Sequence, residues 1–430
     1  MMYRAFLWVW AIAWHAALPV VLAYIYARAR REPVYGQAIG ERFGGGTPIA
    51  PGAIWIHAVS LGEFRAACPL ILALLARGER VLITNITAAG RQEAFKIFAS
   101  DIVAGRVYVR WCPLELPWAI HRFLRRCQPR FGMIMEIELW PQLITQSARR
   151  IPMVMAQAQY PDKSFTRDQK GLARFRAKCL TDFTLILAKS DRHAERFCHL
   201  GASDVRVVGE LRFEQPIPTA QRTAAAELLK QIDSARPRFC LASTAPDEDA
   251  LLIPVLKKLN AQTPKPFFIY VPRHPKDFSV TQTRLKQAGL QMLQRSQDLT
   301  DDLILKTPIP PECDGLFGDS LGEIYFYYAL AQRVFVGDSF NGEGAHNIIE
   351  PLRLFAPVAV GPSIWGIEYP GADAMKVGIL TKLETPDDLY THWSVPPIND
   401  QTQTIERFLE AHGQATQRIV KNLNNAGLLP

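Results

Sequence analysis

The stretch GEGAHNIIEP, residues 342–351, holds side chains that could bind a nucleotide sugar. It follows a buried-strand pattern at 334–336 and begins in a glycine-bearing loop. Asn347 and Glu350 are three residues apart, so on one helical turn they face the same way. Free N–H groups at the start of a helix can hold a phosphate, and a carboxylate one turn further can accept sugar hydroxyls. The alternative is a plain glycine turn in which Glu350 is a helix-end charge.

Two other strand ends in the second half carry groups that suit an anionic ligand. Arg273 and His274 directly follow the predicted strand 267–271. An arginine can bind a phosphate or a carboxylate in a fork, whereas an Arg-His pair between prolines can also be plain surface. Ser243 and Thr244 end another predicted strand and could donate hydroxyls to the same ligand.

The segment 318–332 predicts a helix with a Ser320-x-x-Glu323 capping box. Gly322 would let a ligand approach the N-terminus of this helix, where the helix dipole favours a phosphate. Glu323 is therefore expected to be structural rather than catalytic.

The first half carries two polar turns near its beginning. Glu41 lies in GERFGGG, between the apolar N-terminus and the first strand, where it could face a lipid-borne hydroxyl. The alternative for this loop is a solvated Glu–Arg turn. Ser60 and Gly62 lie at a strand-to-helix turn in WIHAVSLGE. Ser60 could simply cap the helix there, with Glu63 completing a capping box.

Glu136 and Glu138 lie in EIELWP at the end of a predicted strand. Two carboxylates at such a position are costly unless they bind something polar. Their spacing is not that of a metal-binding acidic triplet, and the sequence contains no other metal constellation.

Strands and helices alternate along both halves, which predicts parallel sheets covered on both faces. Ligands of such sheets bind beyond the carboxyl ends of the strands, where these polar side chains lie. The predicted strands are 53–60, 81–85, 106–110, 131–137, 152–157, 184–189 and 205–209 in the first half, and 238–244, 267–271, 334–338 and 357–361 in the second.

The N-terminal residues 5–27 contain no formally charged side chain. As a helix they measure roughly 35 Å, against about 30 Å of bilayer hydrocarbon. Arg28, Arg30 and Arg31 follow closely, while only Arg4 precedes, so the positive-inside bias places the rest of the chain in the cytoplasm. The arginines favour a retained anchor, spanning or obliquely inserted, over a cleaved signal peptide.

The composition is that of a globular protein of two ordinary domains, with 430 residues, 48% hydrophobic and 21% charged. Seven scattered cysteines without a CxxC pair indicate neither a disulfide framework nor a zinc site, and they fit a reducing compartment. The net charge of +8 favours anionic partners such as a membrane surface or a phosphorylated ligand. No nucleic-acid motif accompanies this charge, so nucleic acid is not expected as a partner.

Taken in order, the motifs resemble those of the Kdo (3-deoxy-D-manno-octulosonic acid) transferases of lipopolysaccharide assembly, which have the GT-B glycosyltransferase fold. The resemblance covers nearly the whole chain, with the anchor in front. The motifs that carry it are GERFG, WIHAVSLGE, EIELWP, KSDRHAERFCHLGA, VVGELRFE, LAST, VPRHP, GDSLGEIY and GEGAHNIIEP.

The resemblance implies an inverting transfer of Kdo from CMP-Kdo to a glucosamine hydroxyl of the lipid A precursor (lipid IVA), at the cytoplasmic face of the inner membrane. Glu41 matches the family's proposed base. Cationic groups and helix N-termini would stabilise the departing CMP phosphate, so neither a metal nor a cofactor is expected. The residues expected on the donor side are Ser243, Thr244, Arg273, His274, Gly322, Glu323, Asn347 and Glu350, and those on the acceptor or Kdo side are Ser60, Gly62, Glu136 and Glu138.

The expected organisation is α/β, with two Rossmann-like domains facing a central cleft. Its parts are an anchor helix over 1–31, an acceptor domain over 32–212, a linker over 213–237, a CMP-sugar domain over 238–398 and a polar C-terminal helix over 399–430.

Four segments depart from the family's usual patterns. TNITAAG stands in place of TTxTxTG, EIELWP in place of ETELWP, AQAQYPDKSF in place of an Asn-Ala-Arg stretch, and GEGAHN in place of a two-glycine loop. These departures bear on the sugar and the acceptor more than on the fold. The alternatives are a divergent paralogue that moves a related ulosonic acid or uses another lipid, a nucleotide-sugar epimerase on the same fold, and an inactive membrane protein that binds a sugar nucleotide or nucleic acid.

Overall fold

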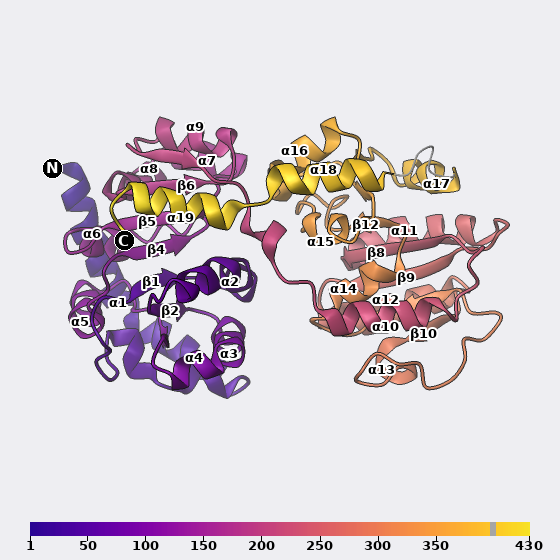
Figure 1. Ribbon diagram of the computed structural model, residues 1–430, viewed down its shortest axis with the longest axis horizontal. Helices are drawn as coiled ribbons and strands as arrows, with labels where there is room; N and C mark the ends of the chain where they lie inside the picture. The colour runs from indigo at the N-terminus through magenta and orange to yellow at the C-terminus, as the bar shows by residue number, and fades with distance from the viewer. Residues whose placement is uncertain (396–400) are drawn as a thin grey trace. The chain divides into compact units, whose positions relative to one another are not determined.

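The computed structural model describes residues 1–395 and 401–430. The chain forms two α/β units (Figure 1). Unit 1 comprises Met1–Gln215 and Gly413–Pro430, and unit 2 comprises Pro216–His412. The last 18 residues thus return to the first unit. The boundary expected between 398 and 399 lies outside the described residues.

Unit 1 is built on a seven-stranded parallel sheet in the order β3-β2-β1-β4-β5-β6-β7. All seven strands predicted for the first half are present. They are β1 (Ile54–His57), β2 (Val81–Asn85), β3 (Val107–Trp111), β4 (Gly132–Met135), β5 (Met153–Ala158), β6 (Leu185–Ala188) and β7 (Val205–Val207).

Helices cover both faces of this sheet, because successive strand residues point to opposite sides. Ile54 and Ile56 pack on one face with α2 and α19, and Trp55 packs on the other with α5 and α6. The helices of unit 1 are α2 (Leu61–Ala76), α3 (Ala88–Ile97), α4 (Ala99–Val103), α5 (Pro117–Cys127), α6 (Pro141–Ala148), α7 (Asp162–Asp168), α8 (Ala173–Ala177), α9 (Asp191–His199) and α19 (Ala415–Asn425), with 3₁₀ turns η1 (Pro33–Gly36), η2 (Ile39–Phe43), η3 (Lys178–Asp182) and η4 (Leu211–Glu214).

The apolar N-terminus forms one helix, α1 (Met2–Ala29), which is long and apolar enough to cross a membrane. Only one stripe of this helix is buried against unit 1. Leu7, Ala11 and Ile25 make up this stripe, and their spacings of four and fourteen residues bring them to the same side of a helix. The remaining sides carry exposed apolar residues.

Unit 2 contains a second seven-stranded parallel sheet in the order β10-β11-β9-β8-β12-β13-β14. The four strands predicted for the second half are present, but β10, β11 and β14 escaped prediction. Their sequences, MLQ, GLF and LTK, lack the repeated valines that marked the equally short β7 (VRV) and β13 (VAV). The strands are β8 (Arg238–Thr244), β9 (Phe267–Pro272), β10 (Met292–Gln294), β11 (Gly315–Phe317), β12 (Arg333–Val336), β13 (Val358–Val360) and β14 (Leu380–Lys382).

The core of unit 2 lies between this sheet and the apolar sides of α11, α12 and α17. The helices are α10 (Thr219–Leu229), α11 (Pro246–Asn260), α12 (Phe278–Gln287), α13 (Arg295–Asp298), α14 (Ile324–Leu330), α15 (Ile349–Leu352), α16 (Glu368–Lys376), α17 (Pro386–Ser394) and α18 (Thr402–His412), with 3₁₀ turns η5 (Pro275–Asp277) and η6 (Trp365–Ile367).

The C-terminal residues form two helices, so the prediction of a single helix over 399–430 is wrong. Helix α18 belongs to unit 2, and α19 belongs to unit 1. Gly413 and Gln414 separate them, and Gln414 has a left-handed φ of 65°, which a continuous helix cannot contain. In the predicted linker 213–237, α10 packs against α14 of unit 2.

Candidate functional site

The carboxyl ends of the strands stand out by their backbone conformation. Glu136 after β4, Gln157 in β5, Ser243 in β8 and Asp338 after β12 have φ between 55° and 59°. Non-glycine residues seldom adopt this conformation, and it concentrates at functional sites. The pairing register also shifts at Gln157 and at Ser243, as in a β-bulge. In both units, therefore, the carboxyl edge of the sheet is the candidate site.

Glu41 lies in η2, with its carboxylate at the end of β3. Its Oε2 accepts the Trp111 backbone N–H at 2.9 Å and lies 2.9 Å from Nη1 of Arg91. The side chains of Glu41 and Arg91 are only 14% and 7% exposed. Within the described residues, Oε1 of Glu41 has no hydrogen-bond partner.

A stack of aromatic and cationic groups supports Glu41 from behind. The guanidinium of Arg91 lies 4.8 Å from the Trp111 ring centre, and that of Arg42 lies 4.0 Å from it. Tyr35 stacks on the same indole at 5.8 Å. Burial lowers the pKa of Arg42 to about 10. The stack fixes the arginine that holds Glu41.

The turn after β1 is a helix cap. The Oγ of Ser60 accepts the Glu63 N–H at 3.3 Å and donates to the Glu63 carboxylate at 3.0 Å. The other Glu63 oxygen accepts the Val59 N–H at 2.8 Å, so the reciprocal bond goes to the residue before the cap. The capping interpretation of Ser60 is confirmed. Gly62 is exposed in the first turn of α2.

This turn is connected to Glu41 through α3. A Cβ on Gly90 would lie 3.2 Å from the backbone of Ser60, so the start of α3 packs directly on the turn. Arg91, the next residue, reaches Glu41. Glu41 and Ser60 therefore belong to one local assembly at the carboxyl edge of the unit 1 sheet.

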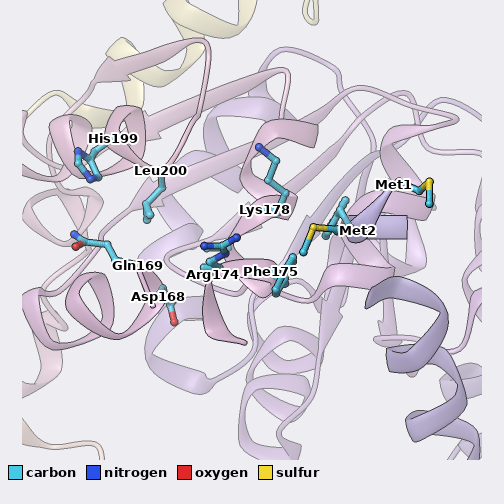
Figure 2. Close-up of a pocket in the computed structure, with 11 residues that line it drawn as sticks. Met1, Met2, Asp168, Gln169, Arg174, Phe175, Lys178, His199 and Leu200 are labelled. Carbon is cyan, nitrogen blue, oxygen red and sulfur yellow. The ribbon is translucent and has the colours of Figure 1, made fainter. Parts of the chain in front are cut away.

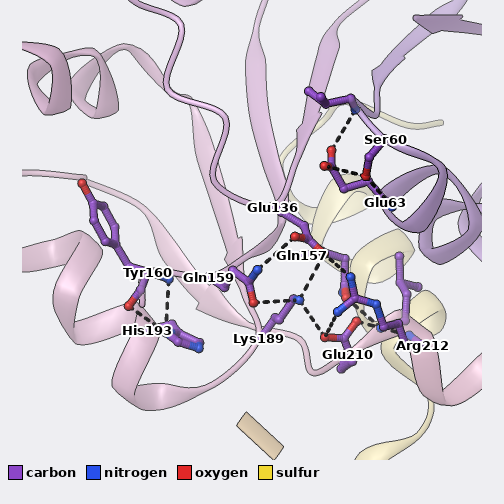
Figure 3. Close-up of polar contacts among 12 residues, drawn as sticks. Ser60, Glu63, Glu136, Gln157, Gln159, Tyr160, Lys189, His193, Glu210 and Arg212 are labelled. Atoms are coloured by element: carbon purple, nitrogen blue, oxygen red, sulfur yellow. Dashed lines mark hydrogen bonds and ion pairs between the residues drawn. The ribbon is translucent and has the colours of Figure 1, made fainter. Parts of the chain in front are cut away.

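Glu136 is the centre of a charged network (Figure 3). Its Oε1 lies 2.6 Å from Nη2 of Arg212 and 3.5 Å from Nζ of Lys189. Its Oε2 accepts a bond from Gln159 at 2.9 Å. Lys189, only 1% exposed, also contacts Glu210 at 2.7 Å. Two carboxylates and two cations thus balance each other at this edge.

The carboxylates near this network differ in proton affinity. Burial alone would raise the pKa of Glu136, but Lys189 and Arg212 hold it below its usual value. Glu63 has no such cation, and burial together with Glu136 and Glu138 raises its pKa to about 7. Burial also raises the pKa of Glu138, which accepts the Trp140 N–H at 2.7 Å. Glu63 can therefore hold a proton near neutral pH.

Sequence reasoning gave the cations of these assemblies no role, although signals for them existed. Lys189 is the last residue of the predicted strand 184–189, and Arg212 lies in the motif VVGELRFE. Arg91 follows the TNITAAG segment that departs from the family pattern. The sequence around these residues does not show that their side chains reach a carboxylate far away along the chain.

The two residues after β9 in unit 2 carry a positive and a polar side chain without a partner in the described part of the chain. Arg273 and His274 are exposed, and neither side chain makes a hydrogen bond or an ion pair within the described part of the chain. The Arg273 N–H donates to Thr244 at 2.9 Å, which joins the ends of β8 and β9. Burial lowers the pKa of His346, and the charge of Arg273 adds to that effect. The predicted residues 243–244, 273–274 and the 342–351 loop are therefore neighbours.

The first residues of the loop after β12 are held by a carboxylate of α11. The carboxylate of Glu248 accepts the N–H groups of Asp338, Ser339 and Phe340 at 2.6–2.8 Å. These three N–H groups are consequently not available to a phosphate. Asp338 itself lies 2.6 Å from Nε2 of His346, which ties the start of the loop to the GEGAHN segment.

The predicted pair Asn347 and Glu350 lies at a very short helix. The Asn347 Oδ1 accepts the Ile349 N–H at 3.0 Å, so this side chain caps the start of α15. Glu350 lies in the first turn and is half-buried. One side of the loop is fixed by Gly344, where a Cβ would come within 2.7 Å of the Trp365 ring.

The predicted capping box at 320–323 is wrong. Helix α14 begins at Ile324, and the hydroxyl of Ser320 bonds the Glu323 carboxylate, not a backbone N–H. Gly322 has φ +84°, which turns the chain before the helix starts. Arg295 holds Glu323 with two bonds of 2.6 and 2.8 Å, so the expectation that Glu323 is structural agrees with its contacts.

Two open cavities flank α1, away from these strand ends. One, of about 910 Å³, lies at the N-terminal end of α1 beside Arg174, Phe175 and Lys178 (Figure 2). The other, of about 580 Å³, lies between α1 and helices α5 and α6. None of the predicted site residues lines either cavity.

Sequence comparison connects the chain to described enzymes. The profile of the family described as 3-Deoxy-D-manno-octulosonic-acid transferase (kdotransferase) matches residues 37–215. The 3-deoxy-D-manno-octulosonic acid transferase of Bordetella pertussis is 34% identical over 433 residues, which cover 97% of this chain and 98% of that protein. The transferase of the same name from Haemophilus influenzae is 31% identical over 425 residues, with 95% and 91% covered.

Solved structures share the fold at low identity. The UDP-GlcNAc 2-epimerase from Neisseria meningitidis matches with a TM-score of 0.57 and 12% identity, over 87% of this chain and 100% of that chain. A glycosyltransferase from Rickettsia africae matches with a TM-score of 0.55 and 11% identity, over 88% and 98%. With the two parallel sheets, these likenesses confirm the predicted GT-B-like α/β class. The match over nearly all of both chains at 34% identity shows that this chain belongs to the 3-deoxy-D-manno-octulosonic acid transferases, the glycosyltransferases that add Kdo in lipopolysaccharide synthesis.

Proposed function

We propose that this chain transfers Kdo from CMP-Kdo to a hydroxyl of a lipid A precursor, with inversion, and that Glu41 is the base. The observation that carries the assignment of Glu41 is the unequal state of its two oxygens. Oε2 is committed to the Trp111 N–H and to Arg91, while Oε1 has no partner among the described residues. A base held by one oxygen presents the other in a fixed direction.

The proposed reaction is a single displacement. Glu41 accepts the proton of the acceptor hydroxyl as its oxygen attacks the anomeric carbon of Kdo. The bond from that carbon to the phosphate oxygen breaks, and CMP leaves with the electron pair. Attack opposite to the leaving group inverts the configuration.

Unit 2 is proposed to bind CMP at the ends of β8 and β9. Arg273 has no partner within the described chain, so its guanidinium is available to bind the phosphate in a fork. His274, Ser243, Thr244 and the backbone at Gly322 would supply further polar contacts. Asn347 and Glu350 would hold the nucleoside. This binding needs no metal, because cationic side chains offset the charge of the departing phosphate.

The Kdo or acceptor side is proposed to lie at the carboxyl edge of unit 1. The negative charge of Glu136 is already balanced by Lys189 and Arg212. A sugar acid that binds there would contact charged side chains that hold one another in place. Glu138, Ser60 and Gly62 would complete this side. The apolar helix α1 and the arginines that follow it support an inner-membrane location with the two units in the cytoplasm.

A transfer assay tests this proposal. Purified protein in detergent receives CMP-Kdo generated in situ and lipid A precursor, with EDTA present, and the lipid is analysed by mass spectrometry. We expect a mass gain of one or more Kdo units with wild type and none with Glu41→Gln. Glu93→Gln, which removes a carboxylate from a pair with Arg65 on the surface, is the matched control. Activity of Glu41→Gln close to wild type would refute the base assignment.

The same assay addresses the divergent paralogue. The segment 156–165, which stands in place of the family's usual Asn-Ala-Arg stretch, contributes Gln159 to the network of Glu136 and Lys189. Offering a second CMP-ulosonic acid in competition shows which sugar is preferred. A preference for the second sugar would assign the chain to the paralogue.

A further inference from the structure

The smaller cavity beside α1 has the character of a lipid pocket. It measures about 580 Å³ and lies between α1, α5 and α6. Two sets of residues line it, an apolar wall and a cationic or polar rim. The wall comprises Leu7, Trp8, Ala11, Ile12, Pro117 and Trp118, and the rim includes Arg4, His121 and Arg149.

The cavity has a fixed shape, because α1 is bonded to unit 1 along its N-terminal half. The Leu7 carbonyl accepts a bond from Gln142 at 2.6 Å, and the Trp10 indole N–H donates to the buried Glu115 at 2.5 Å. A helix that stands apart in a bilayer makes no such bonds to a globular unit. The helix therefore forms one wall of the cavity.

The opposite side of α1 is apolar and uncovered. Val9, Val20 and Tyr24 on this side are 61–72% exposed, and the wall residues Trp8 and Ile12 are 74% and 65% exposed. Contiguous exposed apolar side chains mark surfaces that contact a membrane or another protein. The cavity thus opens beside a surface that faces lipid, so an acyl chain can enter it without crossing water.

The rim carries the positive charge of Arg4 and Arg149. Neither Arg4 nor Arg149 forms an ion pair with a carboxylate within the described residues, although Arg149 donates to Gln146 at 3.1 Å. Arginines bind phosphates and carboxylates well. An apolar cleft with a cationic rim matches an anionic lipid, with its chain inside and its charge at the rim.

One residue of the cavity wall also contacts the turn that carries the proposed base. Trp118 forms part of its wall and stacks on Phe43 at 5.8 Å, with the two rings 4° from parallel. Phe43 belongs to the same 3₁₀ turn as Glu41. A lipid whose chain lies against Trp118 would have its head close to this turn.

We propose that this cavity binds a fatty acyl chain of the acceptor lipid, and that this contact brings the acceptor sugar to Glu41. The inference rests on the proposed function, since it places that function's substrate. It adds a site for the chain, made by α1, α5 and α6, and so gives α1 a part in substrate binding beyond attachment to the membrane.

The test compares two acceptors, the acylated lipid A precursor and its fully deacylated, water-soluble form. Trp8→Ala removes part of the wall at an exposed position, so folding is not at risk. Ala11→Leu narrows the cavity. Each buried methylene contributes about 0.8 kcal/mol, so losing contact with two of them costs roughly tenfold in kcat/KM. We expect this loss for the acylated acceptor and a change within about twofold for the deacylated one. Ala13→Leu, the same substitution at an exposed position outside the lining, is the control.

Equal losses on both acceptors, or none on either, would overturn the inference. A second readout separates this from failure of the proposed function. A lysophosphatidic acid with a diazirine in its chain is photocrosslinked to wild type in micelles, and the labelled peptides are identified. If wild type transfers no Kdo but peptides of α1, α5 and α6 are labelled, the function fails and the acyl site stands. Labelling confined to residues 168–178 would assign the chain to the larger cavity instead.

Discussion

The role of Arg91 can be tested through its coupling to Glu41. Arg91 Nη1 lies 2.9 Å from Glu41 Oε2, and both side chains are largely buried. The change to make is Arg91→Ala, alone and combined with Glu41→Gln. If Arg91 acts only by holding Glu41, Arg91→Ala should lower the transfer rate of the wild type and have no further effect in Glu41→Gln.

The expected magnitudes follow from the geometry. General base catalysis contributes about 10²–10⁴-fold, which is the loss expected for Glu41→Gln. Arg91→Ala leaves Glu41 held only by the Trp111 N–H, and a displacement of about 1 Å in a reacting group can cost about 10²-fold. We therefore expect a loss of about 10–100-fold for Arg91→Ala. The double variant should be no slower than Glu41→Gln.

The assay is kcat/KM for Kdo transfer, with CMP affinity measured in parallel. CMP affinity should not change, because Arg91 and Glu41 belong to unit 1 and the proposed CMP site to unit 2. Arg91→Lys should recover part of the rate by restoring the charge. Arg65→Ala, which breaks the exposed pair with Glu93, controls for general loss of an ion pair. Multiplicative losses in the double variant would refute the coupling.

Three further predictions concern unit 2 and the stability of unit 1. Arg273→Ala should weaken CMP binding by about 10–100-fold in calorimetry, since hydrogen bonds to charged groups contribute about 1.5–3 kcal/mol, and Lys276→Ala should not. Burial lowers the pKa of His57 from 6.5 to about 4. Between these pH values the unfolded chain binds a proton at His57 and the folded chain does not. The free energy of unfolding should therefore fall by about 3 kcal/mol as pH drops from 6.5 to 4, and a His57→Gln variant that kept this dependence in denaturant titrations would contradict the assignment. Gly344 has a φ of +102°, and a Cβ there would lie 2.7 Å from the Trp365 ring, whereas Gly342 has a φ of +86° and open space around its Cβ. Gly344→Ala should therefore lower stability more than Gly342→Ala, in which backbone strain alone costs about 1–3 kcal/mol. Equal melting temperatures of the two variants would show that the contact with the ring adds nothing.

The alternation of strands and helices was readable because each long strand is a continuous apolar run. Seven such runs predicted the whole sheet of unit 1, and β8, β9, β12 and β13 predicted the centre of the other. The three remaining strands, MLQ, GLF and LTK, lack the repeated valines of the equally short β7 and β13. The long apolar helix α1 was also predictable, since 23 residues without a charge need no tertiary context to be recognised.

Helix starts were less predictable than strands. Ser60-x-x-Glu63 is a true cap, whereas the same spacing at Ser320 is not, because Gly322 turns the backbone and Arg295 takes the carboxylate. The pattern is identical in both places, and only the surrounding chain differs. Similarly, no local pattern shows that Glu248, some 90 residues earlier, occupies the N–H groups of Asp338, Ser339 and Phe340.

The sequence by itself determined the fold class, the apolar helix, the family motifs and the strand ends where polar groups gather. It could do so because these depend on local composition and on period. Only the tertiary structure decided which charges meet, such as Arg91 with Glu41, 50 residues apart, and Lys189 with Glu136, 53 apart. It also decided that α1 lies against α6 and so forms a cavity wall. Contacts of this kind depend on how distant segments pack, and no local pattern of residues encodes that.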